Sequence, residues 1–344
     1  IVQSAQPNGL WTYSNLVTRN AAGAGGHAMA SFLLGLPSQV QRSHTPFEPF
    51  YHVQEPSVYV QDDWRARSWL TLNLGLRYDV FTPFTEEEDR LSNLDLTTPR
   101  VLVAGRDGAS RTAGVSTDYG NIGPRFGFAA TLPRTSVLRG GYGLTYFPST
   151  IASFAYMKNA PLFSIYGPVI SDATLLGGVP SVFLRDGLPP QPGAPPIAPN
   201  LLSGGFRAVD LNIKATRVHQ FNLQFEKEFG GNVATVGYIG SRGQRNGMNP
   251  DVNVAPPGAG AVQPRRRYAS TLPNLTTLNY YGSTWETYYD AFQATFQRRL
   301  SGGLSFNTYY RLADAGWTDF VPWGGLVVER EAAPGGMRHM WGGE

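Results

Sequence analysis

Apolar and polar side chains alternate along residues 69–80, WLTLNLGLRYDV. This period of two is typical of a β-strand with one apolar face, because successive side chains of a strand point to opposite sides. At roughly 3.3 Å per residue the stretch extends to about 40 Å, and at a tilt near 40° it crosses a hydrocarbon layer of about 30 Å. Arg77 and Asp79 fall on the polar face and need water. The pattern therefore predicts a strand between lipid and a wet lumen.

Four pairs of such segments repeat one design, a hairpin of two long strands. The pairs are 58–65 with 69–80, 122–131 with 137–147, 217–229 with 233–241, and 288–299 with 304–312. Their turns fall near residues 66, 134, 231 and 301, and we expect all four turns at one rim of the sheet. A weaker strand is expected at residues 38–45.

Long segments rich in proline, glycine, asparagine and serine separate the hairpins, at about residues 81–121, 148–216 and 242–287. Residues 187–200, GLPPQPGAPPIAPN, form neither a central strand nor a helix, because proline lacks a backbone donor. Structureless connections this long argue against a compact soluble domain. Short turns at one end and long loops at the other predict an all-β fold, a partial antiparallel transmembrane β-barrel of the outer-membrane type with about eight to ten long strands.

The composition of the 344 residues supports this fold class. Charged residues make up 15%, against roughly 25% in soluble domains, and Gly 40, Pro 26, Tyr 17, Phe 19 and Trp 7 indicate turns and aromatic strand positions. The net charge is only +3 and the basic run at Arg265 to Arg267 is short, so no nucleic-acid partner is expected. The absence of cysteine excludes disulfides and thiolate catalysis. No apolar run reaches about 18 residues, which argues against a helical membrane protein.

Several segments, taken in order along the chain, resemble a known protein family. Residues 59–95, YVQDDWRARSWLTLNLGLRYDVFTPFTEEEDRLSNLD, resemble the barrel region of TonB-dependent receptors, in particular the Oar-like group common in Acidobacteria. Further segments that resemble this family are ASFLLGLPS (30–38), NIGPRFGFA (121–129), LRGGYGLTY (138–146), FNLQFEKEF (221–229), VGYIGSRG (236–243) and YYDAFQATFQRRLSGGLSFNTYY (288–310). The resemblance covers most of residues 28–312.

The resemblance implies a receptor of the Gram-negative outer membrane that takes up a scarce nutrient, such as a siderophore, cobalamin, an oligosaccharide or a peptide. It implies contact with outer-membrane lipid, and with the TonB complex through a plug that is not readable in this sequence. It implies no enzymatic activity, cofactor or metal. A non-transporting barrel or adhesin that binds a partner through its long loops is the alternative, and a plug and TonB box upstream would decide between them.

We divide the chain into three parts. Residues 1–36 lead into the barrel, residues 37–312 supply strands and extracellular loops, and residues 313–344 form a loop toward a next strand that the sequence lacks. We therefore expect an internal piece of a longer receptor, an arc of wall that does not close on itself. Unpaired backbone groups at its two edges are costly in lipid, so we expect the piece to aggregate when expressed alone.

No residue is assigned a catalytic, cofactor-binding or metal-binding role, and the residues that bind substrate are unknown. The acidic run Glu86 to Asp89 could bind a cation, but a solvated charge run is the simpler interpretation. The five histidines lack the spacing of a metal site, and the glycine-rich segments 23–28 and 140–143 lack the context of a phosphate loop. The histidines are His27, His44, His52, His219 and His339.

Three further groups of side chains are assigned from strand parity and position. Six polar residues are expected to face the lumen, where they could contact a substrate, although pairing with one another or with a plug is the simpler interpretation: Arg77, Asp79, Arg125, Arg139, Gln224 and Glu226. Six apolar residues are expected to face lipid: Leu72, Leu74, Phe221, Leu223, Phe225 and Phe306. Aromatic residues expected in interfacial girdles are Tyr78, Tyr146, Phe147, Phe229 and Tyr310, and those that could stack on ligand from the loops are Tyr280, Tyr281, Trp285, Trp317 and Trp323.

Overall fold

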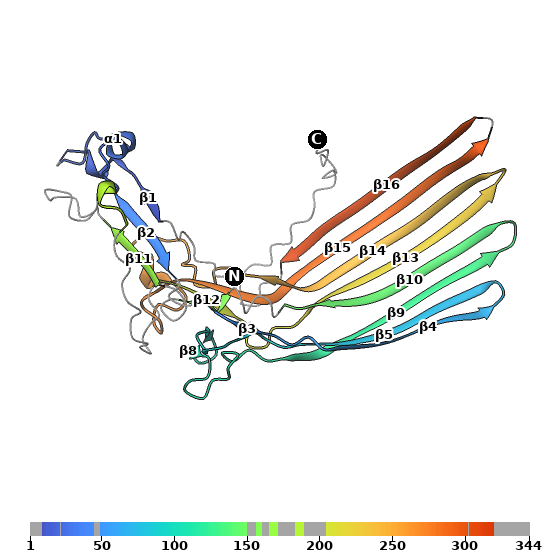
Figure 1. Cartoon of the computed structure of the whole chain (residues 1–344), viewed down its shortest axis with the longest axis horizontal. Helices are drawn as coiled ribbons and strands as arrows, with labels where there is room; N and C mark the ends of the chain where they lie inside the picture. The colour runs from blue at the N-terminus through green and yellow to red at the C-terminus, as the bar shows by residue number, and fades with distance from the viewer. Residues whose placement is uncertain are drawn as a thin grey trace.

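One broad sheet dominates the computed structural model, which describes residues 9–20, 22–44, 49–149, 156–159, 165–170, 183–188, 204–301 and 303–319. Eight long strands of this nine-stranded sheet are antiparallel to one another in the order β4, β5, β9, β10, β13, β14, β15, β16 (Figure 1). Their bounds are β4 Ser57–Arg67, β5 Leu70–Phe81, β9 Asp118–Leu132, β10 Ser136–Phe147, β13 Thr216–Phe229, β14 Asn232–Met248, β15 Leu275–Ser301 and β16 Leu304–Asp319. We call these eight strands the wall.

All four hairpin turns lie at one end of the wall, at the right of Figure 1. The prediction that the turns share one rim is therefore confirmed, as is the prediction of about eight to ten long antiparallel strands. Among the described residues no pairing joins β4 to β16, so the wall is open at both edges. No helix in the described part has the length and apolar character needed to cross a membrane.

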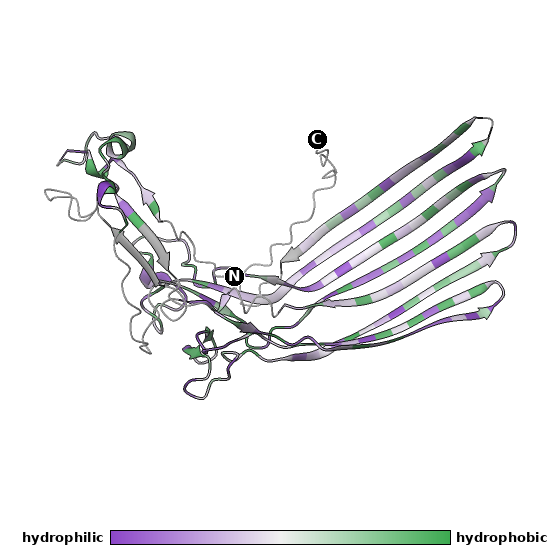
Figure 2. Ribbon diagram, viewed as in Figure 1, coloured by the Kyte–Doolittle hydropathy of each residue, from purple (hydrophilic) through white to green (hydrophobic). Residues whose placement is uncertain are grey.

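The strand register keeps the two faces of the wall separate. Leu74 lies opposite Phe126, Tyr142 opposite Phe221, and Leu138 opposite Phe225, so apolar residues of neighbouring strands meet on one face. Figure 2 shows the result as alternating hydrophobic and hydrophilic bands along the strands. All six residues expected to face lipid share this apolar face, whereas Arg77, Arg125 and Arg139 belong to the opposite, polar face.

Several wall strands are longer than the alternating pattern predicts. β14 continues to Met248, β15 begins at Leu275, and β16 continues to Asp319, beyond the expected boundary at residue 312. Backbone pairing with the neighbouring strand extends each ladder where side-chain alternation is weak, as in residues 313–319. The rest of the predicted C-terminal loop, residues 320–344, lies outside the described residues.

The described parts of the long loops are not structureless, contrary to the sequence-based expectation. β7 (Ser92–Asp95) pairs with β8 (Arg100–Val103), and β12 (Gly204–Val209) runs parallel to the first residues of β15. A short 3-10 helix, η3 (Gln263–Arg265), lies in the loop after β14. Residues 91–117, 156–159, 204–215 and 248–281 form an ordered unit at the end of the wall away from the turns, which we call the loop platform (Figure 1).

Two apolar clusters explain why the loop platform is ordered. One is formed by Leu91, Ala104, Ala113, Val115, Met157, Val209 and Ile213, and the other by Leu94, Phe206, Ala208, Leu275 and Leu278. Each cluster draws residues from segments that are far apart in the sequence. Burial of these side chains offsets the conformational entropy that the loops lose on ordering.

The described part of residues 1–36 contains short regular elements. These are β1 (Leu10–Thr12), the 3-10 helix η1 (Asn15–Val17) and the six-residue helix α1 (Ala28–Leu33). β1 pairs with β2 (Gln39–His44), which confirms the strand expected at residues 38–45, and β2 pairs with β11 (Ile165–Ile170). The remaining short elements are β3 (Tyr51–His52), paired with β6 (Thr85–Glu86), and η2 (Leu184–Asp186).

Candidate functional site

The polar face of the wall carries cross-linked charges. Nε of Arg77 lies 2.9 Å from Oδ1 of Asp79, and Nη2 of Arg77 donates to Ser57. Nη2 of Arg139 lies 3.9 Å from a carboxylate oxygen of Glu226 on the neighbouring strand. Four of the six residues expected to face the lumen therefore pair with one another, as the simpler interpretation predicts.

Arg125 differs from Arg77 and Arg139. Within the described part of the chain it makes no hydrogen bond or ion pair, and its side chain is exposed. Glycines flank it on both neighbouring strands: a Cβ added to Gly75 would lie 3.5 Å from Cβ of Arg125, and one added to Gly143 would lie 3.9 Å from Cγ. The two neighbouring strands therefore place no side chain directly opposite Arg125.

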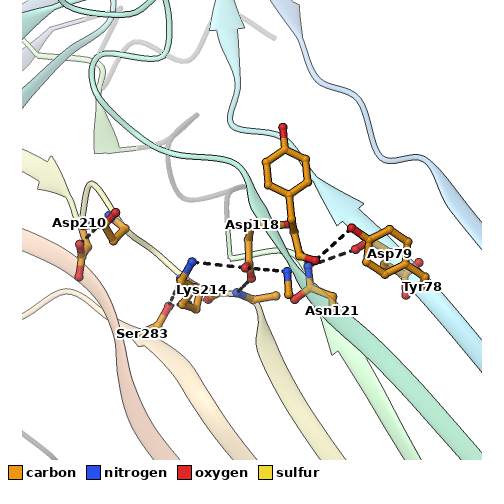
Figure 3. A network of polar contacts seen from close by, with 11 residues as sticks. Tyr78, Asp79, Asp118, Asn121, Asp210, Lys214 and Ser283 are labelled. Atoms are coloured by element: carbon orange, nitrogen blue, oxygen red, sulfur yellow. Dashed lines mark hydrogen bonds and ion pairs between the residues drawn. The ribbon is translucent and has the colours of Figure 1, made fainter.

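A buried carboxylate joins the wall to the loop platform. Asp118, at the start of β9, is 2% exposed and accepts the backbone N–H of Ala215 at 2.9 Å. Its Oδ1 lies 3.5 Å from Nζ of Lys214, whose backbone oxygen accepts the hydroxyl of Ser283 at 2.6 Å (Figure 3). Asn121 donates to the backbone oxygens of Asp79 and Asp118. This network fixes residues 214–215 against β5, β9 and β15.

Two buried asparagines close the free edge of β12. The side-chain amide of Asn93 donates to the oxygen of Val209 at 2.9 Å and accepts the N–H of Val209 at 2.8 Å. Asn159 makes the same two contacts with Arg207, at 2.8 and 2.9 Å. Residues 207 and 209 point their backbone groups away from β15, so the two side chains take the place of a further strand.

The acidic run at 86–89 stabilises the local loop structure. Glu86 is 1% exposed and accepts the backbone N–H groups of Glu88 and Arg90, and Asp89 pairs with Arg111 at 2.8 Å. The prediction of a solvated charge run is wrong for Glu86, because the β3–β6 pairing and the Arg90 side chain enclose it. Burial, and then the charge of Glu86, raise the pKa of the Tyr51 hydroxyl.

The loop aromatics split into core residues and a surface pair. Tyr280 and Tyr281 pack against the two apolar clusters, and Tyr281 lies 5.2 Å from Tyr156, measured between ring centroids. Burial raises the pKa of both hydroxyls. The ring centroids of Trp285 and Trp317 lie 6.2 Å apart, toward the end of the wall away from the turns. Trp323 lies outside the described residues. The first two residues therefore build the platform and are not free to stack on a ligand.

The aromatic girdle is only partly placed as predicted. Phe147 directly follows Tyr146 in β10, so it points to the polar face, and Tyr310 lies in the middle of β16, opposite Ala294. Phe147 therefore does not share the apolar face, and Tyr310 does not lie at a strand end. At the turn rim, the apolar face instead carries a cluster in which Phe296 lies 6.1 Å from Phe229 and 5.8 Å from Phe306.

The remaining candidate residues have local structural roles. His27 caps α1, His219 lies 2.8 Å from the hydroxyl of Tyr142, and His52 lies in β3. The side chain of His44 and all of His339 lie outside the described residues, which contain no group of three metal-binding side chains. Arg265 and Arg266 donate to backbone oxygens of their own loop.

The two glycine-rich segments serve backbone geometry. Gly26 has a φ of +74°, and a Cβ there would lie 2.5 Å from the backbone nitrogen of Arg19. A Cβ on Gly140 would lie 2.6 Å from the ring of Phe128. The interpretation as turns and crowded backbone is therefore confirmed, and neither segment has the arrangement of a phosphate loop.

The residues that shape the site most were not identified from the sequence. Asn93, Asp118, Asn159 and Lys214 lie in the segments 81–121 and 148–216, which the sequence predicts to be polar loops. Each acts on a backbone or side chain more than 45 positions away, and no spacing in the sequence signals such a contact.

Several solved structures are similar to parts of this chain. The iron transporter FrpB of Neisseria meningitidis (F5-1 variant) is 11% identical, with a TM-score of 0.38, over 84% of this chain and 28% of its own. The siderophore receptor PirA of Pseudomonas aeruginosa is 12% identical, with a TM-score of 0.37, over 81% of this chain and 44% of its own. The outer membrane transporter YddB of Escherichia coli is 11% identical, with a TM-score of 0.41, over 81% of this chain and 29% of its own. The chain thus spans less than half the length of each. No curated protein matches it.

A family model supplies the assignment. The model described as "Outer membrane beta barrel domain" matches residues 1–315, which include the whole wall up to Ala315 in β16 and most of the loop platform. An apolar face and a polar face on eight long antiparallel strands fit a wall between lipid and water. The chain therefore belongs to the outer membrane β-barrel domain family and is a protein of the outer membrane.

Proposed function

We propose that this chain is barrel wall of a TonB-dependent receptor of the Oar-like group, which takes up a scarce nutrient across the outer membrane. The nutrient class remains open among siderophores, cobalamin, oligosaccharides and peptides. On this proposal the loop platform captures the nutrient, the polar face lines the lumen, and the TonB complex drives passage through a plug. The chain has no catalytic role in this scheme.

The observation that supports the proposal is the attachment of the loop platform to the wall through Asp118. The Asp118 network attaches residues 214–215 to the start of β9, so the loops are held at fixed positions above the wall. A receptor needs such pre-ordered loops, because loops that order only on binding lower the affinity by their entropy loss. The family resemblance of residues 28–312 supports the finer assignment to TonB-dependent receptors.

Energy-dependent uptake is the test. Cells with and without the gene are given limiting ferric siderophore, cobalamin, oligosaccharide or peptide, and the accumulation of each labelled nutrient is measured before and after a protonophore. We expect deletion to abolish accumulation of one nutrient class, and the protonophore to abolish it equally in the parent strain.

The alternative function is a non-transporting barrel or adhesin that binds a partner through the platform. The ordered platform suits this role as well, because a rigid loop surface can bind a protein or a glycan. Under this alternative, cells bind a ligand at their surface with the protonophore present, and deletion changes the accumulation of no nutrient. That outcome would refute the transport proposal.

A further inference from the structure

Two opposite charges on the polar face of the wall lack an ionic partner. Arg125 in β9 makes no polar contact within the described part of the chain, and Asp63 in β4 accepts only one hydrogen bond there, from the amide of Asn73. On the same face, Arg77 pairs with Asp79 and Arg139 pairs with Glu226. Arg65, the next residue of this parity in β4, directs its guanidinium to the backbone oxygen of Ser68. Within the described part of the chain, Arg125 and Asp63 therefore have no partner of opposite charge.

A hollow of about 270 Å³ lies over β4, β5 and β9, with Arg125 in its lining. Asp63 is not a lining residue, but its carboxylate accepts a hydrogen bond from the lining residue Asn73. The hollow is lined by Gln61, Asn73, Leu74, Gly75, Arg125, Phe126 and Gly127. The hollow exists because glycines face it: Gly75 lies opposite both Arg125 and Gln61, and Gly127 lies opposite Asn73. Its volume is just below the range of roughly 300–1,000 Å³ typical of drug-sized ligands, so it suits a smaller solute.

The register explains why the two charges do not neutralise each other. Asp63 lies opposite Asn73, and Arg125 lies opposite Gly75, so the residues are two strands and two positions apart. Strand spacing of about 4.8 Å and a rise of about 3.4 Å per residue place their Cα atoms about 12 Å from each other. No ion pair joins them within the part of the chain that the structure describes.

We propose that this hollow, with Arg125 in its lining and the carboxylate of Asp63 beside it on Asn73, binds a small zwitterion of the amino-acid or short-peptide type. The planar guanidinium fork suits a carboxylate, which it can hold through two parallel hydrogen bonds. The carboxylate of Asp63 suits an ammonium group and disfavours a purely anionic solute. The side-chain amide of Gln61, which has no partner among the described residues, can donate to and accept from a peptide group.

The site rests on the proposed function in one respect, because the polar face must line a water-filled lumen. Its test does not depend on transport, since binding to the purified protein needs no energy source. Failure of binding with intact uptake refutes this site alone. Binding without energy-dependent uptake refutes the transport proposal and leaves the site standing.

The test measures the affinity of the complete gene product, purified in detergent from the outer membrane, for labelled L-alanyl-L-alanine by equilibrium dialysis. Two analogues each remove one charge: L-alanyl-L-alanine amide lacks the carboxylate, and N-acetyl-L-alanyl-L-alanine lacks the ammonium group. We expect the dipeptide to bind at least tenfold more tightly than either analogue. Equal affinities for the three compounds, or no saturable binding, would overturn the proposal.

Variants assign each charge to its partner. Arg125→Gln should weaken dipeptide binding at least tenfold and leave binding of the amide unchanged, whereas Asp63→Asn should weaken dipeptide binding and leave binding of the N-acetyl analogue unchanged. Arg139→Gln is the matched control, because Arg139 lies on the same face but already pairs with Glu226. An equal loss in Arg139→Gln would mean a general electrostatic effect and would overturn the site.

Gly75→Leu tests the hollow without altering a charge. Gly75 has ordinary strand geometry, so a side chain is tolerated there and would extend from a Cβ that lies 3.5 Å from Cβ of Arg125. We expect this variant to abolish dipeptide binding. Heat-modifiable mobility on gels verifies that each variant is folded, and undiminished binding to folded Gly75→Leu would contradict the proposed location.

Discussion

Nζ of Lys214 lies 3.5 Å from Oδ1 of Asp118, although the two residues are 96 positions apart in the sequence. Lys214 belongs to the loop platform and Asp118 is the first residue of a wall strand. The carboxylate is buried and also accepts the N–H of Ala215. Since a buried charge needs partners, this contact ties the order of the platform to the integrity of the wall.

We expect Asp118→Asn to loosen the platform from the wall. The amide keeps the size of the side chain but loses the charge that faces Lys214 and weakens the bond to Ala215. A cost of about 1–3 kcal/mol is typical for a weakened buried polar contact. The measurement is hydrogen exchange of the Ala215 amide, which should become faster. Asp107→Asn is the control, because Asp107 is exposed in the same platform and should leave this exchange rate unchanged.

We expect Asn93→Leu to destabilise the platform by about 1–3 kcal/mol for each backbone group left without a partner. Leucine has a similar size but cannot bond the N–H and C=O of Val209, which lie at 2.8 and 2.9 Å from the amide. Limited proteolysis between residues 204 and 215 should detect the change. Asn212→Leu, at an exposed platform position, should not alter the cleavage rate. Equal cleavage of both variants would contradict the edge-closing role.

The turn between β7 and β8 should weaken at low pH. Burial acts to raise the pKa of Asp95, but hydrogen bonds from the side chains and backbone of Thr97 and Thr98 outweigh it and lower the pKa from 3.8 to about 2. A carboxyl whose pKa is lower in the folded state stabilises that state above its unfolded pKa. The stabilisation is therefore complete above about pH 4 and is lost as the pH falls through about 2. NMR shifts of the Thr97 and Thr98 amides should titrate near pH 2, and a midpoint near 3.8 would contradict this.

Cysteine labelling should establish which face of the wall meets lipid. The sequence contains no cysteine, so single variants are labelled without background. In the assembled outer-membrane protein, we expect Asn73→Cys on the polar face to react with a charged, water-soluble maleimide, and Leu74→Cys on the apolar face to be protected by lipid. Gln224→Cys and Phe225→Cys form a second pair. Reaction at Leu74 and Phe225 alone would reverse the assignment of the faces.

The predictions from sequence were most accurate where the pattern is local. The hairpins, their shared rim of turns and the common face of Leu74, Phe221 and Phe306 all follow from an alternation that each strand carries within itself. Predictions that depended on position along a strand were less accurate, because strand ends are set by pairing. β16 continues to Asp319 for this reason, which places Tyr310 in mid-strand.

The sequence by itself determined a two-faced wall of long antiparallel strands, because a period of two specifies both the strand and its sides without reference to the rest of the chain. Only the tertiary structure decided the rest. Asn93 bonds a residue 116 positions away, and Asp118 bonds residues 96 and 97 positions away. Arg125 has no charged partner among the described residues, because the register places Gly75 and Gly143 opposite it. In sequence, a polar residue that will be buried looks like one that stays solvated, since its partner is chosen by how distant segments pack.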